Sequence, residues 1–132
     1  MIILDASAAI DYLVDGGERG EWVRERVVDE SNVAAPHVID LEVVSGLRQL
    51  LERDEVTLRQ AANALADFVD LDVVRYPVTV LLDRIWQLRT VLTPYDAAYV
   101  TLGEALGSPL LTTDSRLARA HGHRAAVVAF PG

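Results

Sequence analysis

The sequence contains neither cysteine nor lysine, and each absence excludes a kind of chemistry. Without cysteine there are no disulfides, no thiolate zinc sites and no cysteine nucleophile. All twelve basic residues are arginine, so any mechanism that needs a lysine amine is excluded as well. The chain also lacks an apolar run long enough to span a bilayer and the basic start and cleavage site of a signal peptide. We therefore expect a cytoplasmic protein with no membrane partner.

Positive charge is scarce, and the formal net charge is −8. Proteins that bind nucleic acid by themselves usually carry the opposite sign, because contacts to phosphate dominate their affinity. Either the partner is not a nucleic acid, or a cation must lie between it and the protein. The 132 residues, 51% of them hydrophobic, are enough for one domain over 1–132 with its own core.

Short apolar runs alternate with segments of helical periodicity along the whole chain. The pattern predicts strands at 1–4, 32–35, 72–76, 110–112 and 125–130. It predicts helices at 7–14, 18–29, 37–53, 57–69, 78–91, 94–106 and 115–121. Such alternation is typical of an α/β fold with a parallel sheet and helices on both faces. Ligands of such sheets bind outside the carboxyl ends of the strands.

Two of the predicted strands end in an aspartate. Asp5 follows the first strand in "MIILDASAA", and Asp114 follows the fourth in "PLLTTDSR". Either residue by itself is typical of a helix N-cap. Asp96 lies in the first helical turn after "TP", where the helix dipole favours a carboxylate. Each of these carboxylates therefore has a purely structural interpretation when it is taken alone.

The helix predicted at 37–53 carries two further carboxylates, Asp40 and Glu42. The helical spacing predicts a buried arc made of Val43, Val44, Leu47, Leu50 and Leu51. Glu42 falls outside this arc, beside Ser45 and Gly46, which is typical of a solvated face but also leaves room for a ligand. Asp40 falls inside the arc. Periodicity alone does not choose between the two carboxylates.

Taken together, the carboxylates suggest a shared function. If they converge on one pocket, their mutual repulsion raises some of their pKa values. A hard divalent cation such as Mg²⁺ or Mn²⁺ removes that repulsion, because such ions take oxygen ligands. It also activates water for phosphoryl chemistry and inverts the local charge. The pattern therefore favours a metal-dependent enzyme that acts on a phosphate.

Three segments carry a resemblance to a known family: "MIILDASAAIDYL", "APHVIDLEVVSGLRQLL" and "TPYDAAYVTLGEALGSPLLTTDSRLARA". In this order, over the whole chain, they resemble the PIN-domain ribonucleases, and more closely the VapC toxins of VapBC toxin–antitoxin pairs. The resemblance implies a PIN-like three-layer α/β/α sandwich with a central, mainly parallel sheet. It implies an endoribonuclease that hydrolyses RNA and so inhibits translation and growth.

The resemblance also assigns residues and partners. It implies that Asp5, Glu42, Asp96 and Asp114 are catalytic and hold one or two ions of Mg²⁺ or Mn²⁺, and it selects Glu42 over Asp40. It gives Ser7, Thr113 and Arg116 roles in substrate binding, although a cap, strand-end packing and a surface arginine are their structural alternatives. The implied partners are an RNA substrate and a cognate VapB-type antitoxin. The implied assembly is a homodimer that forms a heterotetramer or a larger complex with the antitoxin.

Other interpretations of the acidic pattern differ in function. A receiver domain and a haloacid-dehalogenase-like phosphatase both place aspartates at strand ends, but both need a lysine that this chain lacks. Two alternatives stay open. One is a PIN nuclease that acts in RNA processing, and the other is a non-catalytic metal-binding domain that acts only through a partner.

Overall fold

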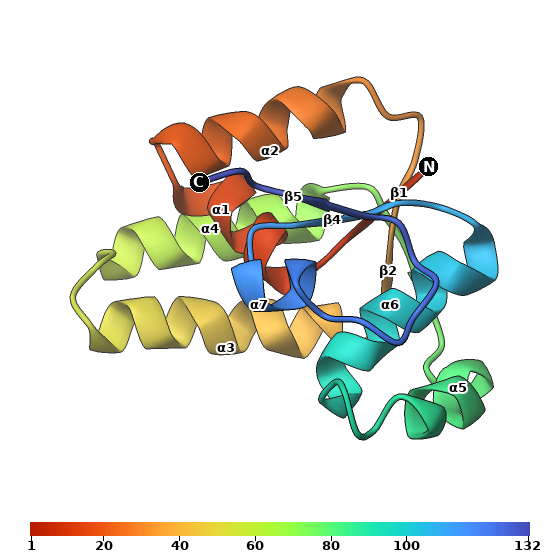
Figure 1. The fold of residues 1–132 in the computed structure, drawn as a ribbon. Helices are drawn as coiled ribbons and strands as arrows, with labels where there is room; N and C mark the ends of the chain where they lie inside the picture. Colours follow the sequence, from red (N-terminus) through yellow and green to blue (C-terminus); the bar gives the residue numbers. More distant parts are fainter.

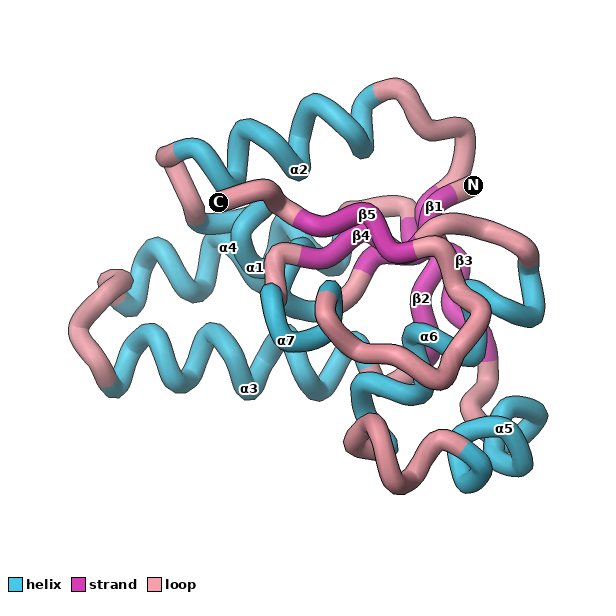
Figure 2. The backbone as a smooth tube through the Cα atoms, viewed as in Figure 1, coloured by secondary structure: helices cyan, strands magenta, loops and turns pink.

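Five short strands form one sheet in which every neighbouring pair is parallel (Figures 1 and 2). The computed structural model describes all 132 residues. The strands are β1 (Ile2–Leu4), β2 (Val33–Pro36), β3 (Val73–Tyr76), β4 (Leu110–Thr112) and β5 (Val127–Ala129). Their order in the sheet is β3-β2-β1-β4-β5. The chain therefore builds outward from β1 on one side, and then crosses back to add β4 and β5 on the other.

Helices fill the connections between the strands. They are α1 (Ala6–Val14), α2 (Glu18–Val28), α3 (Ile39–Glu52), α4 (Leu58–Asp70), the 3₁₀ helix η1 (Thr79–Leu81), α5 (Leu82–Gln87), α6 (Pro94–Leu106) and α7 (Ser115–Ala118). Right-handed crossovers place α1 to α4 on one face of the sheet and α5 to α7 on the other. The packing agrees, because α1 packs against α2, α3 and α4, whereas α6 packs against α5, β1, β2 and β4. The predicted three-layer α/β/α arrangement is confirmed.

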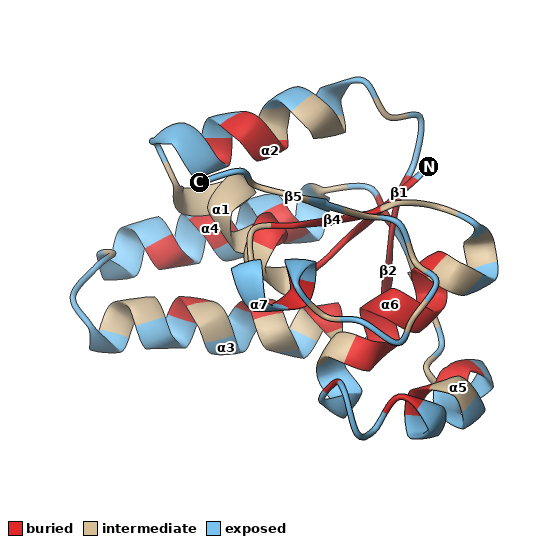
Figure 3. Cartoon of the chain, in the orientation of Figure 1, coloured by how far each residue is buried: buried red, intermediate tan, exposed pale blue.

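The core lies along the central strands and α6 (Figure 3). Every residue of β1, β2 and β4 is buried, as is the stretch 97–103 of α6. Strands that are buried on both faces need continuous apolar runs, and these runs are what the sequence provides. None of the helices combines the length and the apolar character needed to cross a membrane. The buried scaffold holds the carboxyl ends of β1 and β4 beside the first turn of α6.

Several predicted elements are shorter than the pattern indicated. The helix expected at 78–91 is divided into η1 and α5 and ends at Gln87. Valine and threonine at both ends of this segment are stiff β-branched residues that lower its helix propensity. The helix expected at 115–121 ends at Ala118, and Gly122 then turns the chain with a φ of 85°. The last strand covers only Val127–Ala129.

The buried face of α3 also differs from the predicted arc. Its buried residues are Ile39, Val43 and Leu47, whereas Val44 is 47% exposed and Leu41 is exposed as well. Among the helices, α3 packs mainly against α1 and α4, so only one narrow stripe is covered. Periodicity identified an apolar surplus on this helix but placed the centre of its buried face wrongly.

Candidate active site

Asp5 and Asp114 follow the two strands at which the direction of sheet building reverses. β1 and β4 are paired neighbours, with Leu4 opposite Leu111, so their carboxyl ends meet at one edge of the sheet (Figure 1). Open α/β sheets bind their ligands in the crevice at such a switch point. The topology therefore puts both aspartates where a ligand site is expected.

Both aspartates also cap the helix that follows them. The Asp5 Oδ1 atom accepts a 2.9 Å hydrogen bond from the Ala8 N–H, and Asp114 Oδ1 accepts one of 2.9 Å from the Arg116 N–H. The structural interpretation is thus correct for each residue. The same two side chains line a pocket of about 330 Å³. Capping and facing a pocket are therefore not alternatives, because each carboxylate has two oxygens.

Glu42 and Asp96 reach the same pocket from the first turns of α3 and α6. The structure therefore brings together four carboxylates from four distant parts of the chain. Asp40, the competing acidic residue of α3, does not line this pocket. Its Oδ1 atom instead accepts a 2.8 Å hydrogen bond from Arg75 Nε on β3. The choice of Glu42 over Asp40 agrees with this placement.

Asp5 is the most buried carboxylate of the pocket, with 5% of its surface exposed. Its oxygens accept hydrogen bonds from the Ser7 hydroxyl at 2.7 Å, from the Ala8 N–H and from the Thr112 hydroxyl. Burial nevertheless raises its pKa to about 6, because these neutral donors only partly offset the desolvation of the charge. No arginine contributes to this balance. Asp5 is thus a buried carboxylate without a positive partner.

The two helix-borne carboxylates share this condition. Burial raises the pKa of Glu42, although the Tyr99 hydroxyl donates a 2.5 Å hydrogen bond to its Oε1 atom. Burial also raises the pKa of Asp96, and the neighbouring charge of Asp114 raises it further. Burial of Tyr99 and its hydrogen bond to Glu42 raise the pKa of this tyrosine, so its phenol stays protonated and remains a hydrogen-bond donor. The pocket therefore holds negative charge that the fold does not neutralise.

Asp114 is the exception, because Arg116 pairs with it. The Arg116 Nη2 atom lies 3.2 Å from Asp114 Oδ2. Burial acts to raise the pKa of Asp114, but the hydrogen bonds and charge of Arg116 hold it below its ordinary value. The guanidinium is largely exposed. Arg116 itself lines the pocket, as the sequence suggested for a substrate contact.

The two small hydroxyl residues predicted to bind substrate have different environments. Ser7 lines the pocket and holds Asp5. The Thr113 side chain does not line it, because its hydroxyl donates a 2.6 Å hydrogen bond to Asp11 Oδ2. Its backbone N–H donates to the Ser7 hydroxyl at 3.2 Å. Thr113 therefore holds the Ser7 hydroxyl in place through its backbone N–H. This geometry does not support the predicted direct contact between Thr113 and substrate.

Two residues that hold the carboxylates were missed by sequence reasoning. Thr112 is fully buried and donates to Asp5, and it also accepts a 3.0 Å hydrogen bond from the Asp114 N–H. Tyr99 lies three residues after Asp96, so both share one face of α6. That spacing in "YDAAY" was the available signal for Tyr99. Nothing in "LLTTD" distinguishes the threonine that faces inward from its neighbour.

The donor chemistry of this pocket fits a hard divalent cation. Four carboxylates line it, and carboxylate oxygens are the type of ligand that Mg²⁺ and Mn²⁺ prefer. In their present positions, no three carboxylate or imidazole groups converge at the distance needed to hold an ion. Tyr99, Thr112 and Arg116 each engage one of the carboxylates instead. The pocket is thus acidic and rich in oxygen ligands.

Comparison with known proteins adds independent observations. Residues 2–122 match the family model described as the PIN domain. Ribonuclease VapC12 of Mycobacterium tuberculosis is 39% identical over 127 residues, which cover 96% of this chain and 97% of that protein. Ribonuclease VapC9 of Mycobacterium tuberculosis is 41% identical over 117 residues, which cover 89% and 88%. The similarity therefore extends over nearly the whole of both chains.

Solved structures agree on the fold. Mycobacterium tuberculosis VapC20, described as a Sarcin-Ricin loop cleaving toxin, superposes with a TM-score of 0.68 at 16% identity and covers 89% of this chain and 93% of that one. A chain of VapBC2 from Rickettsia felis, solved with a promoter DNA fragment, gives a TM-score of 0.67 at 13% identity and covers 98% and 99%. The matched family model, the two ribonucleases and this shared architecture place the chain in the PIN-domain family, among the VapC ribonucleases.

Proposed function

We propose that this protein is the endoribonuclease toxin of a toxin–antitoxin pair, and that it adds water across a P–O bond of RNA with Mg²⁺ or Mn²⁺ bound. The observation that carries the proposal is the convergence of Asp5, Glu42, Asp96 and Asp114 on one pocket at the switch point of the sheet. A pocket whose negative charge the fold leaves largely unneutralised suits a site that binds a metal cation. The names of the VapC ribonucleases related to this chain support the same activity.

Asp5, Asp96 and Asp114 would hold the one or two ions, and Glu42, on α3, would bind an ion directly or hold it in place through a water molecule. A bound Mg²⁺ or Mn²⁺ supplies a Lewis acid that lowers the pKa of water and offsets charge on phosphate oxygens. The chain's own residues do the rest. Tyr99 keeps the Glu42 carboxylate turned into the pocket, and Thr112 and Ser7 fix Asp5. A pocket carboxylate with a raised pKa accepts the proton of the attacking water.

The partner we propose is a VapB-type antitoxin, bound by a homodimer in a heterotetramer or a larger complex. Large apolar side chains stay exposed on the helices of one face of the sheet, and they are Val28 on α2, Leu41 and Val44 on α3, and Leu58, Leu65 and Val69 on α4. A protein partner would cover such exposed apolar side chains where they lie together. An acidic pocket would in addition attract a basic side chain of such a partner.

The experiment is cleavage of a mixed cellular RNA pool by the purified protein. We expect cutting with Mg²⁺ or Mn²⁺, none with excess chelator, and none by Asp96→Asn. Asp83→Asn is the matched control, because Asp83 lies in the first turn of α5 as Asp96 does in α6 but is outside the pocket. Both variants lose one charge at the same type of position, so a difference between them reflects the pocket.

The possible outcomes separate a nuclease from a domain that acts only through a partner. Metal-dependent cutting that only Asp96→Asn abolishes supports the nuclease and leaves the identity of the RNA as the next question. Binding of the ion without any cutting would favour a domain that acts only through its partner. Cutting that persists in chelator and in Asp96→Asn would contradict the proposed site.

A further inference from the structure

A second cavity, of about 460 Å³, adjoins the acidic pocket. Two residues, Asp96 and Arg116, line both hollows. The second one lies between the segment 90–93, the first turn of α6, and α7 with the residues that follow it. A polymer that is bound in the acidic pocket can therefore extend past Asp96 into this neighbouring cavity.

The second cavity is richer in basic groups than the first. Arg116, Arg119 and His121 line it, and Asp96 is its only carboxylate. Such a gathering of basic groups stands out in a chain whose net charge is −8. We call this hollow the basic cavity. Its composition suits a ligand that carries negative charge.

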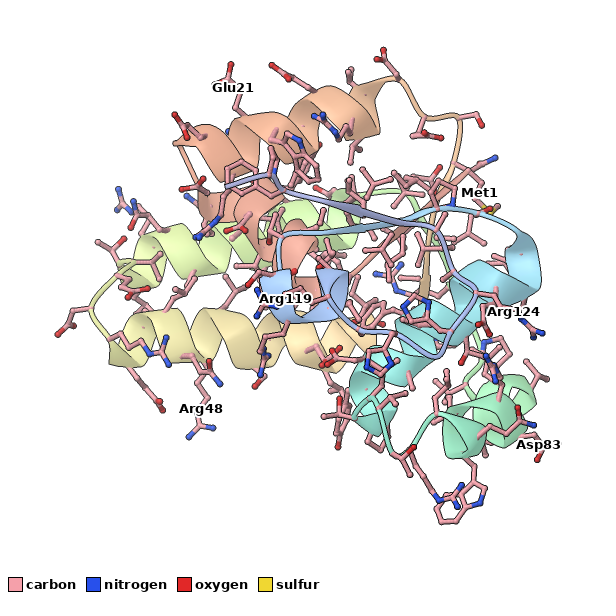
Figure 4. The ribbon with its side chains drawn as sticks, in the orientation of Figure 1. Met1, Glu21, Arg48, Asp83, Arg119 and Arg124 are labelled. Carbon is pink, nitrogen blue, oxygen red and sulfur yellow. The ribbon has the colours of Figure 1, made fainter.

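Arg119 is available for such a ligand because the fold does not use its charge. Arg75 and Arg84 are paired with Asp40 and Glu104. The Arg119 side chain takes part in none of the ion pairs or hydrogen bonds of the molecule, and it is exposed at the end of α7 (Figure 4). The Thr93 hydroxyl accepts the Asp96 N–H at 3.2 Å, so its own proton is free to be donated. Guanidinium and hydroxyl groups are the usual ligands of nucleic-acid phosphates.

We propose that the basic cavity binds a phosphate of the RNA strand next to the bond that is cleaved, with Arg119 as its main ligand and Arg116, His121 and Thr93 around it. This inference rests on the proposed ribonuclease function. Its physical reason is electrostatic, because a pocket of four carboxylates repels a polyanion unless nearby cations hold the strand. A cation in the acidic pocket offsets that repulsion at the reacting phosphate, and the basic cavity offsets it at a neighbouring phosphate.

The test measures binding apart from cleavage. The parent is the full chain with Asp5→Asn, in chelator, titrated with a labelled single-stranded RNA at several salt concentrations. Adding Arg119→Gln and His121→Gln is expected to raise Kd about tenfold, the size expected when a charged hydrogen bond is removed. The slope of log K against log salt is expected to fall by about 0.7 for each phosphate that the protein no longer neutralises. Single-stranded DNA is expected to lose as much affinity as RNA, because binding to a phosphate carries no base information.

Controls and kinetics sharpen the result. Arg59→Gln removes the same charge from an exposed position of α4 outside both cavities, and it is expected to leave Kd and slope unchanged. Arg119→Lys keeps the charge and is expected to restore most of the affinity. In the active protein with metal, Arg119→Gln is expected to raise KM about tenfold with kcat unchanged, because the substrate and the transition state lose the same binding energy.

The inference is overturned if the parent binds no single-stranded RNA, or if the Arg119 and His121 substitutions leave Kd, slope and KM where they were. An equal loss in Arg59→Gln also overturns it, since net charge alone would then explain the effect. Failure of the ribonuclease function gives a different result. In that case the active-site-intact protein cuts no RNA with any ion, whatever residue stands at position 119.

Discussion

Two carboxylates in this protein, Glu104 and Asp5, have opposite surroundings. Glu104 on α6 has a side chain that is 8% exposed, and it accepts hydrogen bonds from Arg84 Nε at 2.9 Å, Arg84 Nη2 at 3.0 Å and the Arg124 N–H at 2.6 Å. These bonds lower its pKa. Asp5 is more deeply buried, receives neutral donors only, and its pKa rises to about 6. The two side chains differ in their partners as well as in burial, because a guanidinium holds the charge of Glu104 and no cation holds that of Asp5.

The difference distinguishes a carboxylate that stabilises the fold from the carboxylates that are available to a ligand. The fold neutralises Glu104, which ties α5 and the segment at Arg124 to α6. It leaves Asp5 and Glu42 without a positive partner, and Asp96 has only the nearby charge of Arg116. An unpaired buried charge costs stability, and proteins keep such groups mainly where a ligand completes them. We therefore expect the carboxylates of the acidic pocket to lower the stability of the metal-free protein and to support the activity of the metal-bound protein.

The largest effect expected from this comparison is a pH dependence of stability. Because the folded pKa of Asp5 is raised from 3.8 to about 6, its contribution to stability is full below pH 3.8 and is lost as the pH rises through about 6. The loss amounts to about 3 kcal/mol. In chelator, the unfolding free energy of the wild type is expected to fall by this amount relative to Asp5→Asn as the pH rises from about 4 to about 7.5. Denaturant titrations at each pH measure it, and parallel profiles of the two proteins would contradict it.

Glu104→Gln is expected to act in the opposite direction. It leaves Arg84 with a weaker partner and lowers the unfolding free energy at neutral pH by about 2 kcal/mol. The folded pKa of Glu104 is lowered, so its contribution is present above the unfolded value of 4.5 and is lost as the pH falls through the folded value. Cleavage per folded molecule is expected to stay unchanged. A loss of activity at full folding would show that Glu104 is more than a structural residue.

Tyr99→Phe is expected to reduce cleavage about tenfold, because Glu42 loses the hydrogen bond that holds it in the pocket. The ring stays in place, so the unfolding free energy is expected to change by no more than about 1 kcal/mol. Tyr95→Phe is the matched control on the same helix, since that tyrosine is 58% exposed. Initial rates of RNA cleavage compare them, and equal rates for both variants would remove Tyr99 from the site.

Asp40→Asn is expected to have the smallest effect. The residue pairs with Arg75 at a half-exposed position, where an ion pair contributes about 0.2–1 kcal/mol. Cleavage is expected to equal that of the wild type, whereas Glu42→Gln, two residues further along α3, is expected to lower it at least about tenfold. If Asp40→Asn were the more damaging change, the assignment of the α3 carboxylate would be wrong.

Local pattern predicted much of the architecture. The strand Leu110–Thr112 was predicted with its observed bounds, and the N-cap Thr93 and Pro94 at the start of α6 were identified from residue type. Pattern succeeded there because buried parallel strands and helix caps depend on a few neighbouring residues. It failed for the face of α3, where Val44 was expected inside and is exposed. The direction of a helix face depends on which helices pack against it, and that is not local information.

The sequence alone predicts that aspartates end two strands of a parallel sheet, excludes lysine and cysteine chemistry, and places the carboxylates in the order of a known family. Periodicity left Glu42 and Asp40 open and the family resemblance selected Glu42; the tertiary structure then places Glu42, and not Asp40, in the same pocket as Asp5. Only the tertiary structure brought Thr112 and Tyr99 to these carboxylates, and placed Arg119 in a hollow beside them. The reason is physical. Caps and strands are set by contacts a few residues apart, whereas a pocket is made of residues such as Asp5 and Asp114 that meet only after the sheet has formed.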